Sequence, residues 1–152
     1  MKLHTFYRST AAYRVRIAAS LKGIPLECAY VHLLKDGGEH NQPAYRAINP
    51  TGGVPSLETE GDVITQSLAI LEFIEETHPE PALLPQDAHG RARVRSLAAM
   101  LAADTHPLIT PRVKKYLTTV GGFDEAAWRA WQVQWFTTGL LALEQRLASE
   151  PE

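Results

Sequence analysis

Two hydroxyl side chains, Ser9 and Thr10, stand where an apolar strand pattern at residues 3–7 gives way to a helical pattern. The N-terminus of a helix presents free N–H groups and the positive end of the helix dipole. A hydroxyl placed there can donate to a thiolate and keep it ionised near neutral pH. A neighbouring guanidinium such as Arg8 can attract a carboxylate. These residues are compatible with a site for a small sulfur anion beside an acidic substrate. The segment alone favours a plain serine cap with solvated arginines, because serine is common at the N-cap of helices.

Three further places in the first half suit ligand binding. Pro55 opens a strand and leaves the N–H and C=O of Val54 free to pair with an extended peptide, and we expect a cis Val54–Pro55 bond. Ser67, as the N-cap of the next helix, would form an anion site, with Gln66 beside it for an adjacent amine or carboxylate. His40, in a polar stretch, could meet a carboxylate. An ordinary strand-entry proline and simple helix capping remain the alternatives.

The second half contributes a short polar run that begins at Asp104 and includes His106. Arg112 follows Asp104 by about two helical turns, so the two side chains could share one face of a helix. A core or surface histidine and a solvated aspartate are the commoner alternatives.

Composition limits the function classes. The chain has 152 residues, 45% of them hydrophobic and 21% charged, and a net charge of −2, which gives no global reason to expect nucleic acid or an anionic membrane as partner. No apolar run approaches the roughly 20 residues of a membrane span, and the strand that begins at once leaves no room for a signal peptide. The only cysteine, Cys28, allows no intramolecular disulfide and fits a reducing cytoplasm. The six histidines lack HxxxH or HxH spacing, so no metal site is predicted.

The pattern predicts an α/β domain followed by an all-helical one. Strands are expected at residues 3–7, 26–31, 55–58 and 63–65, and helices at 13–21, 43–47 and 67–77, in the order βαβ, α, ββα. We expect domains at residues 1–78 and 88–152, joined by a proline-containing linker at 79–87. In the second domain we expect a long helix over 91–117, kinked near Pro107 and Pro111, and another from Asp124 to about residue 148.

These motifs together resemble the zeta class of the glutathione S-transferase superfamily. The resemblance covers essentially the whole chain and rests on the run at residues 9–18 and on Asn49-Pro50, Val54-Pro55, residues 66–70 and residues 83–87. It implies a thioredoxin-like domain followed by a helical domain, glutathione as cofactor, and a cytoplasmic homodimer. Zeta-class proteins are typically maleylacetoacetate or maleylpyruvate isomerases of aromatic catabolism, and the Arg8-Ser9 start and the run at 104–107 look more like the maleylpyruvate branch.

The resemblance also implies a role for each candidate residue. Ser9, with Thr10 beside it, would hold the glutathione thiolate, and the backbone of Val54 before Pro55 would pair with the cysteinyl unit. Gln66 and Ser67 would bind the γ-glutamyl end of glutathione, and His40 would bind its glycine carboxylate. Asp104 would reach the γ-glutamyl amine across a dimer interface. The acidic substrate would be surrounded by Arg8, His106 and Arg112. The thiolate would add to the cis double bond, allow it to rotate, and leave again.

The sequence departs from the family pattern in three ways. Ala11 replaces the signature cysteine, so catalysis must rest on the sulfur of glutathione, and Gly52-Gly53 replaces larger polar residues. Family members also continue well past residue 152, so we expect a truncated helical domain with uncovered apolar surface on its last helix. A general glutathione transferase, an α-haloacid dehalogenase and a non-catalytic interaction module remain alternatives, although a binding module would not need the hydroxyl of Ser9.

Overall fold

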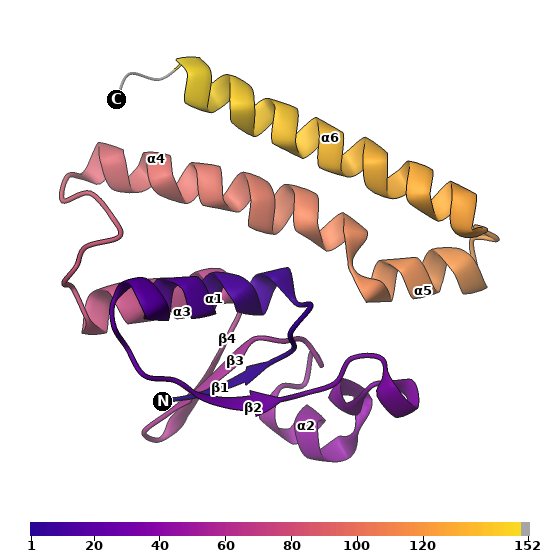
Figure 1. Cartoon of the computed structure of the whole chain (residues 1–152), viewed down its shortest axis with the longest axis horizontal. Coiled ribbons are helices and arrows are strands. Elements are labelled where there is room, and N and C mark those ends of the chain that lie inside the picture. Colours follow the sequence, from indigo (N-terminus) through magenta and orange to yellow (C-terminus); the bar gives the residue numbers. More distant parts are fainter. Residues whose placement is uncertain (150–152) are drawn as a thin grey trace. The chain divides into compact units, whose positions relative to one another are not determined.

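The computed structural model describes residues 1–149, and the chain divides into two compact units, Met1–Pro85 and a second one that begins at Gln86. The first unit is built on a four-stranded sheet (Figure 1). Its strands are β1 (Lys2–Thr5), β2 (Glu27–Tyr30), β3 (Ser56–Thr59) and β4 (Asp62–Thr65), in the spatial order β2-β1-β3-β4. β1 runs parallel to β2 and antiparallel to β3, and β3 runs antiparallel to β4. The predicted thioredoxin-like order is confirmed.

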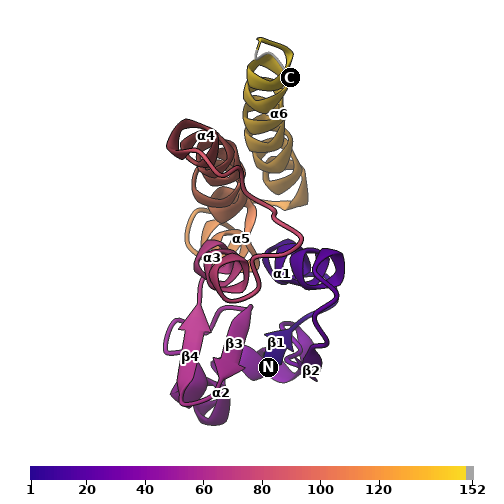
Figure 2. The same cartoon turned by 90° about the vertical axis from the view of Figure 1, so that its left-hand side faces the viewer.

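The helices of the first unit cover both faces of this sheet. α1 (Thr10–Leu21) and α3 (Ser67–Thr77) lie on one face, and α2 (Pro43–Ile48) lies on the other (Figure 2). Two short 3₁₀ turns, η1 (Lys35–Gly37) and η2 (Glu39–Asn41), precede α2. The core between the sheet and helices α1 and α3 consists of fully buried Leu3, Val15, Leu57, Ile70 and Ile74. Each such side chain contributes about 1.5–3 kcal/mol by leaving water, so this core fixes the ends of the elements that bear the candidate site.

A buried ion pair joins α1 and α3 to the chain that follows them. Lys22, the C-cap of α1, has a fully buried side chain whose Nζ lies 2.7 Å from Oε2 of Glu75 on α3. The same ammonium donates to the carbonyls of His78 and Pro81 at 2.6 and 2.8 Å. The Glu75 carboxylate in turn accepts backbone N–H bonds from Leu83 and Leu84. The predicted linker is therefore held to the first unit by side chains rather than left as a loose connection.

The second unit is helical, but its first helix is not continuous as predicted. α4 (Ala88–Ala99) is followed by a π-helical turn, η3 (Met100–Thr105), a 3₁₀ turn, η4 (His106–Ile109), and then α5 (Pro111–Thr119). The expectation of one kinked helix over residues 91–117 is wrong. Pro107 and Pro111 lack the N–H that continues a helix, and Thr110 takes an extended conformation (ψ 157°), which starts a new helix with Pro111 as its first residue.

α6 (Glu125–Ser149) begins as predicted, because Asp124 caps it by accepting from the N–H of Ala127 at 2.8 Å. Trp128 is buried, and Nε1 of Trp131 donates to the carbonyl of Leu108 at 2.7 Å, which holds α6 against η4. Much of the apolar surface of α6 stays open: the exposed side chains are Val133, Phe136, Leu140, Leu141 and Leu147. The predicted incomplete coverage of this helix is confirmed. Among residues 1–149, none of the helices combines the length and the apolar character that crossing a bilayer requires.

Candidate functional site

Three of the predicted segments converge on one end of the sheet of the first unit. In the register of the sheet, His4 near the end of β1 lies beside Ser56 at the start of β3, and Ser56 lies beside Thr65 at the end of β4. The segments that follow β1, precede β3 and follow β4 therefore meet at this end. They carry Ser9 and Thr10, Val54 and Pro55, and Gln66 and Ser67, respectively.

Ser9 is the N-cap of α1, as its position predicts. Its Oγ accepts from the N–H of Ala12 at 3.1 Å, and its side chain is half-buried. A hydroxyl has one hydrogen to donate besides its acceptor lone pairs, so capping leaves the Ser9 O–H available to a ligand at the positive end of the helix. The simple cap and the ligand donor are thus compatible roles. Thr10 is the first residue of α1 and is exposed, as is Arg8 just before the cap.

The segment before β3 presents a backbone edge. The Val54–Pro55 bond is cis, as predicted. Within residues 1–149 the N–H and C=O of Val54 take no part in hydrogen bonding. The chain here is not held by the sheet but by α2: the carbonyl of Gly53 accepts from Oη of Tyr45 at 2.6 Å and from Nδ2 of Asn49 at 2.9 Å. An extended ligand could therefore pair with Val54 without displacing an existing bond.

The local structure requires a glycine at position 52. Its φ is +65°, a left-handed conformation that side chains rarely adopt, and a Cβ there would lie 2.6 Å from the guanidinium carbon of Arg46. Arg46 donates at 2.6 Å to the carbonyl of Pro50. The glycine thus lets α2 and the loop that follows it approach closely.

The predicted cap at the start of α3 is wrong in detail. Gln66, with φ +69°, occupies the cap position, and its side chain makes no capping bond. Ser67 is already the first helical residue, and its buried hydroxyl accepts from Nη1 of Arg14 on α1 at 3.0 Å. Burial lowers the pKa of Arg14, and within the described chain this hydroxyl is the only partner that its guanidinium has. A cation thus lies beside the positive end of a helix with no anion to balance it, which favours a carboxylate there.

His40 lies on η2, beyond the end of β2 that runs parallel to β1, and its side chain is half-exposed. It therefore occupies the same end of the sheet as the three converging segments, on the connection that leads into α2.

The remaining candidates belong to the second unit. Asp104 is exposed on η3, His106 begins η4, and Arg112 is exposed on α5. The expectation that Asp104 and Arg112 share a helix face is wrong, because the chain breaks between them.

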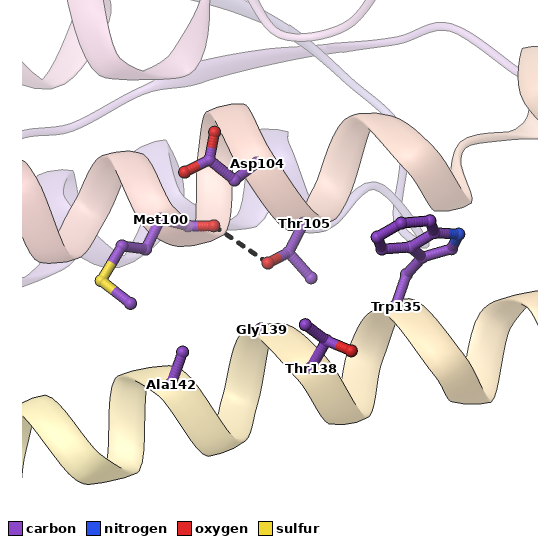
Figure 3. A pocket seen from close by; sticks show the side chains of 7 residues that line it. All are labelled: Met100, Asp104, Thr105, Trp135, Thr138, Gly139 and Ala142. Atoms are coloured by element: carbon purple, nitrogen blue, oxygen red, sulfur yellow. Dashed lines mark hydrogen bonds between the residues drawn. The ribbon is translucent and has the colours of Figure 1, made fainter.

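A cavity of about 190 Å³ lies between η3 and α6. Thr105 points toward α6, whereas the Asp104 carboxylate points away from it (Figure 3). The Thr105 hydroxyl donates to the Met100 carbonyl, five residues earlier, at 2.9 Å, which suits the wider π turn. On α6, Gly139 faces Thr105 so closely that a Cβ would lie 2.0 Å from its Oγ1. The packing of Thr105 on Gly139 therefore fixes the turn that carries Asp104.

Sequence reasoning gave too little weight to three residues of this site. In the sequence, Arg14 is one of several arginines near a helix start, and its contact with Ser67 depends on the packing of α1 beside α3. Tyr45 lies on a six-residue helix that is too short to show a clear periodicity, and Asn49 is the C-cap residue of this helix, where only the Asn49-Pro50 pair marked the place. The available sequence signal for these two residues was their spacing: a tyrosine and an asparagine lie four residues apart, shortly before a Gly-Gly pair.

The chain matches known proteins in both sequence and fold. A model of the glutathione S-transferase N-terminal domain matches residues 3–82. The maleylacetoacetate isomerase of Pseudomonas aeruginosa is 48% identical over 151 residues, which are 99% of this chain and 71% of that protein. A holo structure of maleylpyruvate isomerase, described as a bacterial zeta-class glutathione S-transferase, superposes with a TM-score of 0.95 at 48% identity, over 99% of this chain and 70% of that one. A maleylacetoacetate isomerase from Methylobacterium extorquens AM1 with bound malonate and glutathione gives a TM-score of 0.94 at 44% identity, over the same shares.

Proposed function

This chain belongs to the zeta class of the glutathione S-transferase family, and from that premise we propose that it is a glutathione-dependent isomerase that converts a maleyl keto-acid from cis to trans. The substrate is maleylacetoacetate or maleylpyruvate, the compounds for which its relatives are named. The observation that carries the proposal is the convergence, at one end of the sheet, of a helix-capping hydroxyl, an unpaired backbone edge and an unbalanced cation.

The residues at the sheet end fit glutathione. This tripeptide has a thiol, an extended backbone and a carboxylate at each end, and one relative holds it beside malonate. The free N–H and C=O of Val54 suit the extended cysteinyl unit. Ser67, the first residue of α3, accepts a hydrogen bond from Arg14 of α1, and together they suit the γ-glutamyl carboxylate. Gln66 precedes Ser67 and suits the same end of glutathione. His40 would reach the glycine carboxylate.

Bound glutathione supplies the thiolate nucleophile that acts on the double bond. No residue at the sheet end offers one: Ala11 stands where relatives carry a cysteine, and Cys28 lies within β2, paired with Leu3 of β1. Ser9 supplies the hydrogen bond that holds the thiolate ionised, and the α1 N-terminus adds its positive dipole. Thr10 lies next to this donor and completes the polar surface around it.

The two carboxylates of the substrate require cations. Arg8 precedes the Ser9 cap, so a dicarboxylate that reaches the sulfur would come within reach of its guanidinium. His106 and Arg112, on the second unit, are further groups that we propose for binding substrate carboxylates. These contacts would also stabilise negative charge that spreads onto the keto-acid during the reaction.

We further propose that the enzyme works in the cytoplasm as a homodimer. The exposed Asp104 carboxylate points away from α6, so it is open to a second subunit, where it would bind the γ-glutamyl amine. The mixed composition with a single cysteine suits a reducing compartment.

An isomerisation assay tests the proposal. Maleylpyruvate and maleylacetoacetate are supplied side by side, with and without glutathione, and trans product is followed. We expect turnover of at least one of them that requires glutathione. S-methylglutathione is the matched control, since it occupies the same site but has no thiol, and it should inhibit. Turnover without glutathione, or glutathione binding without any isomerisation, would contradict the proposed reaction.

A further inference from the structure

We propose that Tyr45 and Asn49 are positioning residues for glutathione: by binding the Gly53 carbonyl they aim the N–H of Val54 at the cofactor. This inference rests on the proposed function and assigns to α2 a part in it. Tyr45 lies on α2 and Asn49 is the C-cap residue that directly follows this helix, and both side chains are almost fully buried.

The argument begins with the peptide that joins Gly53 to Val54. A peptide unit is planar, and in the trans form its C=O and its N–H point in opposite directions. The two bonds from α2 hold the carbonyl oxygen at 2.6 Å from Oη of Tyr45 and 2.9 Å from Nδ2 of Asn49. Fixing the oxygen on this side therefore fixes the N–H of Val54 on the other side, where it has no partner within residues 1–149.

The same bonds strengthen the N–H as a donor. Two donors on one carbonyl polarise the amide, and hydrogen bonds in a chain reinforce one another. Burial raises the pKa of Tyr45, so its hydroxyl remains a donor throughout the neutral range. Val54 thus presents an N–H that is already directed and polarised. A freely rotating loop would instead lose conformational entropy when it binds the ligand.

A third buried group completes the network without touching this peptide. Oγ of Ser56 lies 3.0 Å from Oη of Tyr45 and 3.1 Å from Nδ2 of Asn49. Oδ1 of Asn49 also accepts from the N–H and the hydroxyl of Thr51, at 3.0 and 2.8 Å. Both side chains are therefore locked before a ligand arrives, and α2 and the Val54 loop should respond to glutathione as one body.

The test compares two losses of a hydroxyl within this network in the full chain. Tyr45→Phe keeps the ring and removes the bond to Gly53, whereas Ser56→Ala removes a buried hydroxyl that binds the same two side chains but not Gly53. Tyr30→Phe removes a hydroxyl from an exposed tyrosine and serves as baseline. For each variant we would measure the glutathione Kd by calorimetry, kcat at saturating glutathione, the pKa of the bound thiol, and Tm.

We expect Tyr45→Phe to raise the glutathione Kd about fivefold, the effect of one ordinary hydrogen bond. Its kcat at saturation and the pKa of its bound thiol should remain those of the wild type, because Ser9 is untouched. Ser56→Ala should lower Tm by about as much as Tyr45→Phe does, but it should change the glutathione Kd less than about twofold. An unchanged Kd in Tyr45→Phe, or an equal rise in Ser56→Ala, would overturn this inference while leaving the proposed function intact. Failure of the wild type to bind glutathione would overturn both.

Discussion

Removing the Lys22 ammonium should destabilise the first unit more than any exposed charge can. All three N–H groups of the ammonium are used, by Glu75 at 2.7 Å and by the carbonyls of His78 and Pro81 at 2.6 and 2.8 Å. Lys22→Met fills the same space but leaves a buried carboxylate without its counter-charge. Losing one member of a buried pair typically costs about 3–5 kcal/mol, and we expect that loss in the free energy of unfolding.

Urea unfolding of the full chain measures this loss, with Lys114→Met as the matched control. Lys114 and Glu125 lie 2.9 Å apart, nearly as close as the buried pair, but the pair is exposed. Its loss should cost less than about 1 kcal/mol. The double variant Lys22→Met/Glu75→Gln should lose less than the sum of the two single variants, because it leaves no unpaired charge. A Lys22→Met variant as stable as Lys114→Met would refute the reasoning.

The pair also makes a prediction about pH. Burial raises the pKa of the Glu75 carboxyl, but bonds from Lys22 and from the N–H groups of Leu83 and Leu84 outweigh it, and the pKa lies below its usual value. A depressed folded pKa means that the stabilisation is present above the unfolded value of about 4.3 and is lost as pH falls through the folded one. Glu75→Gln should therefore flatten the acid side of the stability curve, and an unchanged slope would contradict this assignment.

Two further substitutions test other parts of the account. Gly139→Ala should lower the free energy of unfolding by about 1–3 kcal/mol, because the added Cβ would overlap Oγ1 of Thr105. Adding Thr105→Ala to this variant should restore much of that loss in urea unfolding. A Gly139→Ala variant as stable as the wild type would show that the helices separate freely. Arg8→Met and Arg112→Met should lower kcat/KM for the keto-acid by roughly ten- to a hundredfold, as expected for a lost charge-assisted bond, with an unchanged glutathione Kd. Normal turnover of the keto-acid by both arginine variants would place its binding site elsewhere.

Local signals predicted most of the first unit. The strand patterns and the apolar spacing of residues 67–77 each depend on a short stretch of sequence, and the observed elements follow them. The cis bond before Pro55 and the caps Ser9 and Asp124 were also predictable, because each depends on one residue and its neighbours.

The errors arose where tertiary packing decides. Ser67 was predicted as a cap, but Gln66 takes that position with a φ that no sequence pattern announces, and the Ser67 hydroxyl turns to Arg14 on another helix. The break between Asp104 and Arg112 was underestimated, because two prolines can kink a helix or divide it, and the π turn before them depends on Thr105 and its neighbour on α6.

The pKa of the thiol of bound glutathione tests the central claim most directly, because the account rests on Ser9 as the donor that ionises it. Thiolate absorbance is followed against pH with saturating glutathione, in the wild type and in Ser9→Ala, with Thr10→Ala as the neighbouring control. We expect a wild-type value well below that of a free thiol, and a rise of about one unit or more in Ser9→Ala, equivalent to about 1.4 kcal/mol. Thr10→Ala should change it little. A thiol pKa that is the same in Ser9→Ala as in the wild type would contradict the account.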